Sequence, residues 1–148
     1  MGWRGVVLSL CLVPQAAAAD VLTFEIRPGN DPTKNLTCRM ELRDGLIIAV
    51  EVDGIKIPHQ AMRWPVRRAE AAALGDAMAA FVAGDLPSVE AYTSHPLPFP
   101  YISVTWSTRV SGAPMSGFYF QPGLDLPPPL ARVLDAVMPG SVCQGATG

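Results

Sequence analysis

The sequence has few of the residues that usually assemble a reactive site. Its 148 residues include three cysteines and two histidines. The histidines, His59 and His95, have no partner at a metal-ligand spacing such as His-x-x-x-His. The chain also lacks a Gly-x-Ser-x-Gly motif, a Ser-x-x-Lys motif and a glycine-rich phosphate loop. We therefore predict no catalytic residues, no metal site and no cofactor, and expect that the protein is not an enzyme.

A strong net charge is also absent. The formal net charge is −2, and Arg67-Arg68 is the only adjacent pair of basic residues. A domain that binds nucleic acid typically carries a basic patch or stripe. The sequence therefore predicts that nucleic acid is not a partner.

The only long apolar run lies near the N-terminus, and at residues 5–13 it is too short to span a bilayer. Arg4 precedes this run, and an Ala-x-Ala pattern ending at Ala19 follows it. This order is typical of a secretory signal peptide. We expect residues 1–19 to be a signal peptide and residues 20–148 to form a single domain with no transmembrane segment. The protein is then periplasmic or secreted, and the excess of arginine over lysine, typical of a GC-rich bacterial genome, favours the periplasm.

Cysteine use agrees with export. Cys11 belongs to the predicted signal peptide, and lipid anchoring there is not expected, because Leu10 stands where a lipobox has a small residue. Cys38 and Cys143 remain in the mature chain, and an oxidising compartment permits one disulfide between them. We predict that this bond pins a C-terminal tail to the sheet.

Alternating apolar and polar residues predict strands at 21–27, 36–43 and 46–52. Asp44-Gly45 between the last two is a strong hairpin signal, and Asp53-Gly54 repeats it before a further strand that begins at Ile55. Two later segments, 101–110 and 115–121, predict a second hairpin. Together they predict an antiparallel sheet of about five or six strands, a meander plus a hairpin.

Two segments have helical periodicity. Residues 66–82 are rich in alanine, and an apolar stripe of Leu74, Met78, Phe81 and Val82 recurs at helical spacing. A shorter stripe at 130–137 predicts a C-terminal helix. Strands grouped around helices, rather than alternating with them, indicate an α+β fold in which one main helix and a short C-terminal helix cover the sheet.

Two surfaces are candidates for binding. The proline-rich, aromatic segment 92–101 resembles a stiffened loop that presents side chains to a partner, although it could instead pack onto the core. The polar face of the last hairpin, including Arg109 and Tyr119, is the second candidate, although it could be an ordinary solvated sheet face. The predicted binding residues are Tyr92, His95, Phe99, Tyr101 and Arg109.

Three functions are compatible with these patterns. The first is a non-enzymatic module that binds another protein or an envelope component. The second is a carrier of a small apolar ligand held between helix and sheet, lined by the stripe of the main helix with Trp64 and Trp106; a solid core is the competing interpretation. The third is a hydrolase whose residues, His59 or His95 among them, come from distant segments. The sequence favours the first and identifies neither the partner nor the oligomeric state.

Overall fold

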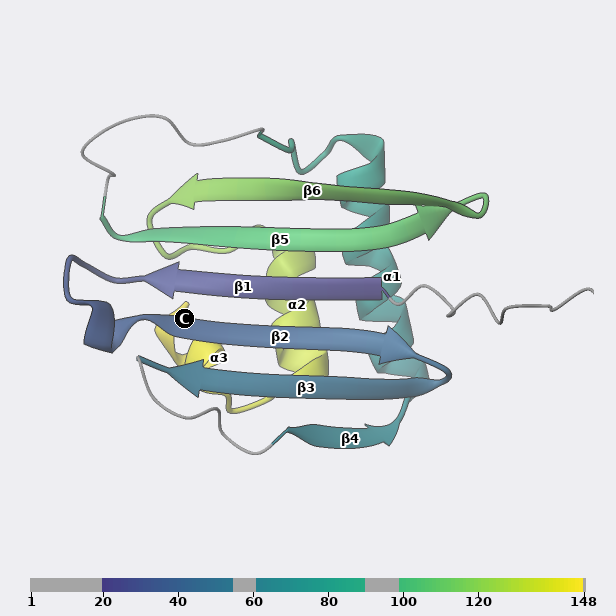
Figure 1. Ribbon diagram of the computed structural model, residues 1–148, viewed down its shortest axis with the longest axis horizontal. Helices are drawn as coiled ribbons and strands as arrows, with labels where there is room; N and C mark the ends of the chain where they lie inside the picture. Colours follow the sequence, from purple (N-terminus) through teal and green to yellow (C-terminus); the bar gives the residue numbers. More distant parts are fainter. Residues whose placement is uncertain (1–19, 55–60, 90–98, 148) are drawn as a thin grey trace, which may run out of the picture.

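A computed structural model describes residues 20–54, 61–89 and 99–147 of the chain. These residues form a six-stranded antiparallel sheet with three α-helices, which is the α+β architecture that the sequence predicts (Figure 1). The strand order across the sheet is β4-β3-β2-β1-β5-β6. Strands β4 and β6 are therefore the two edges.

The first three strands are the ones that the sequence predicts at 21–27, 36–43 and 46–52, and they run as a meander. They are β1 (Asp20–Arg27), β2 (Leu36–Arg43) and β3 (Leu46–Asp53), with a short 3-10 turn, η1 (Pro32–Lys34), between the first two. Asp44 and Gly45 have φ angles of 51° and 73°, the left-handed conformation that a two-residue hairpin turn requires. Leu22, Phe24 and Ile26 of β1 are wholly buried. Each contributes about 1.5–3 kcal/mol to folding through burial of its side chain.

The fourth strand differs from the sequence prediction. The strand expected from Ile55 lies outside the described residues. The strand that pairs with β3 is β4 (Met62–Pro65), in which Met62 lies opposite Ala49 and Trp64 opposite Ile47. β4 has four residues and ends in proline, so its alternation is too short to be recognised in the sequence.

The last two strands form the second predicted hairpin. They are β5 (Tyr101–Val110) and β6 (Ala113–Pro122). β6 begins two residues earlier than the sequence predicts, because Ala113 already pairs with Val110 across a turn at Ser111-Gly112. β5 also pairs with β1, which joins the hairpin to the meander in one sheet.

All three helices lie on the same face of the sheet (Figure 1). They are α1 (Arg68–Ala83), α2 (Pro128–Val137) and α3 (Val142–Ala146). Leu74, Met78 and Phe81 of α1 are buried as predicted, but Val82 is 38% exposed, so its assignment to the apolar stripe is wrong. The buried face of α1 is instead centred nearer to Ala77, whose small side chain allows close packing. We call the other sheet face, which carries no helix among the described residues, the open face.

Aromatic rings fill the space between α1 and the hairpin. The Phe81 ring stacks on Trp106 with 5.1 Å between centroids and meets the edge of Tyr119 at 6.0 Å. Gly117 lies behind the indole, where a Cβ atom would come within 2.7 Å of Trp106 Nε1. The Trp106 side of the suggested ligand space is therefore occupied by protein side chains, which supports the solid-core interpretation there.

The C-terminal tail forms α3, a five-residue helix that the sequence analysis missed. The Sγ atoms of Cys38 and Cys143 lie at bonding distance, 2.03 Å apart, so the predicted disulfide pair forms. Both cysteines are fully buried. The bond attaches α3 to the covered face of the sheet, beside α2.

Candidate functional site: a groove beside strand β4

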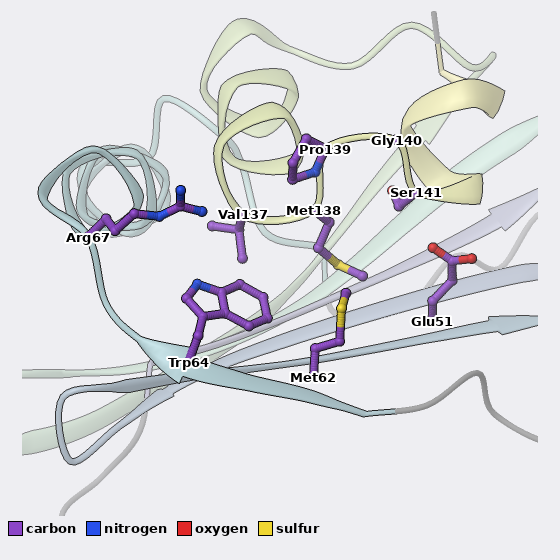
Figure 2. A pocket seen from close by; sticks show the side chains of 9 residues that line it. All are labelled: Glu51, Met62, Trp64, Arg67, Val137, Met138, Pro139, Gly140 and Ser141. Atoms are coloured by element: carbon purple, nitrogen blue, oxygen red, sulfur yellow. The ribbon is translucent and has the colours of Figure 1, made fainter.

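An apolar groove of about 380 Å³ opens beside β4, between the sheet edge and the helices (Figure 2). One wall is Met62 and Trp64 of β4, and the other is the chain from the end of α2 to the start of α3. We call it the β4 groove. Its lining residues are Glu51, Met62, Trp64, Arg67, Val137, Met138, Pro139, Gly140 and Ser141.

Strand alternation explains the β4 wall. Met62 and Trp64 pair with Ala49 and Ile47, which are buried on the covered face, so both side chains point towards the helices. Trp64 is half-buried, whereas Met62 is 54% exposed because it lies at the sheet edge with space beside it. Arg63, between them, points to the open face. The β4 groove therefore presents a flexible thioether and an indole face, which adapt well to apolar partners.

A buried carboxylate positions the Trp64 end of the groove. Glu70, in the first turn of α1, is 1% exposed. Its Oε1 accepts hydrogen bonds from Trp64 Nε1 at 3.0 Å and Arg67 Nε at 2.8 Å, and Arg67 Nη2 lies 2.7 Å away. Its Oε2 accepts from the Arg67 backbone N–H at 2.7 Å. One side chain thus fixes the indole, the arginine and the start of the helix.

The pKa of Glu70 lies below its ordinary value of 4.5. Burial acts to raise this pKa, but the hydrogen bonds from the Arg67 backbone and side chain and from Trp64, with the positive charge of Arg67, together outweigh it. Glu70 is therefore ionised at neutral pH and acts as a structural acceptor. Its oxygens are occupied, so the groove gains no free acid from it.

The opposite end of the groove is fixed by α3. Ser141 caps this helix by accepting from the Gln144 backbone N–H at 3.1 Å. Glu51 of β3 accepts from the Val142 backbone N–H at 3.1 Å. With the disulfide one residue further along, these bonds hold the Pro139–Ser141 wall against the sheet. In Figure 2, Arg67 and Glu51 lie at opposite ends of the apolar lining.

This arrangement is suited to holding apolar side chains. Within the described ranges no three His, Cys, Asp or Glu side chains gather as they would around a metal ion. The polar groups of the lining already have partners: Arg67 binds Glu70, Glu51 binds the α3 backbone and Ser141 caps α3. The chemistry that remains available is apolar contact along Met62, Trp64 and the facing wall.

The residues predicted for binding lie elsewhere. Tyr92 and His95 are outside the described residues, as is His59. Phe99, 39% exposed, has its ring centroid 5.3 Å from that of Tyr101, so these two rings lie close together. Tyr101 in turn packs on Phe120 across β5 and β6 on the open face, with 5.0 Å between centroids. Their binding role stays a prediction.

The remaining hairpin residues do not join this pair. Arg109 is at the far end of β5, where its guanidinium donates to the Gly112 carbonyl of the turn at 3.1 Å. Tyr119, suggested for the polar face, is on the covered face with Trp106 and is 7% exposed, because its position pairs with the buried Val104. Its inclusion in a solvated face is wrong.

Sequence reasoning missed the β4 groove because its lining comes from four separate segments. One local signal was present: Glu70 lies three residues after Arg67, at the spacing of a helix start whose carboxylate returns to the backbone. The large apolar residues Met62 and Trp64 just before that start were a second. Neither signal indicates the facing wall, which depends on the disulfide and α3.

None of the helices in the described ranges is long and apolar enough to cross a membrane. Comparison of the chain with protein-family models, with curated proteins and with solved structures finds no match. The arrangement of residues in the β4 groove is therefore the basis on which a function is argued.

Proposed function

We propose that the protein is an exported, non-enzymatic module that binds another protein, and that the β4 groove receives apolar side chains of that partner. One observation carries the proposal: an apolar groove of about 380 Å³ opens directly beside a sheet edge, with Met62 exposed in its wall. Concave apolar sites with a few fixed polar groups are the usual binding places on proteins.

The rigidity of the groove supports this role. Glu70 fixes the Trp64 wall through four contacts, and the disulfide with Glu51 fixes the facing wall. A site held in shape before binding loses less conformational entropy when a partner docks. These supports are what a binding surface needs, whereas catalysis would need free acids, bases or nucleophiles in the lining.

Export is part of the proposal and has its own measurement. The N-terminal pattern at 1–19 and the buried cysteine pair support it. Intact mass spectrometry of protein purified from its native compartment is expected to give a chain that begins at Asp20 and lacks the two thiol hydrogens. A chain that retains residues 1–19, or that carries free thiols, contradicts export.

The binding site is tested with random peptides displayed on phage and selected on the purified protein. We expect selected peptides to be rich in apolar residues and to lose at least tenfold in affinity against Met62→Asp, because the charge must then be desolvated in an apolar groove. Met115→Asp is the matched control, since Met115 is similarly exposed, at 40%, on the hairpin at the other side of the sheet. Peptides that bind Met62→Asp as well as wild type, or the absence of any selected peptide, contradict the proposal.

A further inference from the structure

We propose that the partner of the β4 groove adds a β-strand to the outer edge of β4. Its apolar side chains, facing the groove, alternate with an acidic side chain that faces Arg63. This inference rests on the proposed function and names the conformation and sequence class of the partner. It follows from the backbone, the side-chain alternation and the charges at this edge.

No backbone group of the described residues pairs with the outer side of β4. The Val66 N–H donates to the Gly45 carbonyl at 3.2 Å, which sets the phase of pairing between β4 and β3. By antiparallel alternation, Met62 and Trp64 then direct their backbone groups to β3, and Arg63 and Pro65 direct theirs outward. Since proline has no N–H, the outer edge offers the N–H and C=O of Arg63 and the C=O of Pro65. An extended segment can pair with all three.

Side-chain alternation fixes what such a strand presents to each face. The residues beside Met62 and Trp64 point towards the helices, into the β4 groove. The residue beside Arg63 points to the open face, where paired side chains on neighbouring strands interact. The partner therefore presents apolar, polar and apolar residues in turn.

Charge decides which polar residue suits the middle position. Arg63 has no ion pair among the described residues, and neither does Arg68 at the start of α1. Arg67 is paired with Glu70, and its side chain is 73% exposed. An acidic side chain opposite Arg63 supplies the missing counter-charge in a region where three arginines lie within six residues of sequence.

The same charge disfavours a second copy of this chain as the occupant. A two-fold antiparallel pairing that uses both hydrogen bonds of Arg63 places Arg63 directly opposite the same residue of the other copy. Like charges in that position are destabilising. A register that instead places Arg63 opposite Pro65 lacks one N–H donor. The edge is therefore suited to a heterologous acidic strand.

The probes are short synthetic peptides with a central Leu-Glu-Leu or Leu-Lys-Leu in a threonine frame, capped at both ends, with affinities measured by calorimetry. On wild type we expect the glutamate peptide to bind about fivefold more tightly, the scale of an exposed ion pair. Arg63→Glu is expected to reverse this preference. N-methylation of the peptide's central residue removes the N–H that would donate a hydrogen bond to the Arg63 carbonyl. This change is expected to weaken binding about two- to tenfold.

The outcomes separate this inference from the proposed function. If Met62→Asp abolishes peptide binding while Arg63→Glu leaves the preference unchanged, or N-methylation has no effect, the added strand is wrong and the apolar groove stands. If Met62→Asp binds the peptides as wild type does, both fail. A wild-type protein that dimerises at low micromolar concentration through β4, with the dimer lost in Arg63→Pro, would make a second copy the occupant and overturn the inference.

Discussion

The two edge strands of the sheet, β6 and β4, differ in length and in the contacts that the rest of the described chain makes with them. β6 is ten residues long, and the segment after α1 returns to it: the Val89 N–H donates to the Phe118 carbonyl at 2.7 Å, and Ser88 accepts from Trp106 Nε1 at 3.3 Å. β4 is four residues long, and no described segment pairs with its outer side. Among the described residues, Arg63 and Pro65 are the features of this edge that oppose strand pairing.

Both are recognised ways of preventing unwanted strand pairing, but they have different consequences. Where backbone already pairs with the edge, as Val89 does with Phe118, a partner cannot pair without local unfolding. An edge that carries a charge and a proline is expected to disfavour pairing with its own copy, while a strand of opposite charge can still pair. The proposed binding belongs to β4 on this comparison, and the following predictions test the difference between the two edges.

The largest expected effect comes from removing the support behind the β4 groove. Replacement of both cysteines, Cys38→Ala with Cys143→Ala, is expected to lower the free energy of unfolding by about 2–5 kcal/mol, because the bond closes a loop of 105 residues in the unfolded chain. Urea unfolding measures this. Wild type under reducing conditions should show a similar decrease, and a double variant as stable as the oxidised protein would contradict it.

The next effect comes from Glu70. Glu70→Ala removes the acceptor of the Trp64 indole N–H and of the Arg67 backbone N–H, and a loss of about 1–3 kcal/mol is expected. Glu70→Gln keeps the volume of the side chain and removes its charge, so the unfolding free energy of this variant measures the contribution of the charge alone.

The effect of Glu70 should depend on pH with a defined sign. Its pKa is lowered in the folded protein, so its stabilisation is fully present above the ordinary value of 4.5 and is lost as pH falls through the lower folded-state pKa. The difference in unfolding free energy between wild type and Glu70→Gln should be constant near neutral pH. It should shrink as the pH falls below 4.5 and through the folded-state pKa of Glu70. A difference that is independent of pH in acid would show that the charge is not responsible.

At the other edge, Gly117→Ala should break the covering of β6. The added Cβ meets Ser88 and Trp106 Nε1, so we expect about 1–3 kcal/mol of destabilisation and weaker docking of residues 88–89. The matched control is Gly75→Ala in α1, where no atom lies within 4 Å and a helix former should add about 0.5–1 kcal/mol. An equal change in unfolding free energy in the two variants would show that Gly117 is not in close contact with Ser88 and Trp106.

The smallest expected effect concerns Arg63, whose charge is expected to oppose strand pairing at the outer edge of β4. Arg63→Thr removes the like-charge repulsion and keeps strand propensity, so we expect a several-fold increase in self-association with little change in unfolding free energy. Sedimentation at increasing concentration measures it. Arg109→Thr, at an exposed position of β5, is the control and should leave the association state unchanged. The same result from both variants would mean that Arg63 does not guard the edge.

Much of the fold could be predicted because its signals are local. Asp44-Gly45 and the alternation on either side specify a hairpin within eighteen residues, and the alanine-rich segment specifies α1. β4 and α3 were not predicted from the sequence, because elements of four or five residues are too short to show a periodic pattern. Their positions depend on contacts with distant parts of the chain: the Trp64–Glu70 bond and the Cys38–Cys143 pair.

The candidate site could not be predicted either, because it depends entirely on contacts between distant parts of the chain. Its walls meet only because β3, β4 and the segment after α2 converge at one sheet edge. The aromatic and proline-rich segment 92–101 gave a stronger sequence signal, and its Phe99 and Tyr101 rings lie 5.3 Å apart. A sequence pattern reveals which side chains are unusual, but a groove is a property of the space between elements.

Trp64 has an optical consequence for any study of this protein. In the proposed mature chain, which lacks residues 1–19 and therefore Trp3, two indoles remain, Trp64 and Trp106. Trp106 is buried against Phe81, whereas Trp64 donates to an ionised carboxylate and borders the groove. We therefore expect the fluorescence of Trp106 to be shielded and that of Trp64 to shift when a partner enters the groove, so that the proposed binding can be followed without a label.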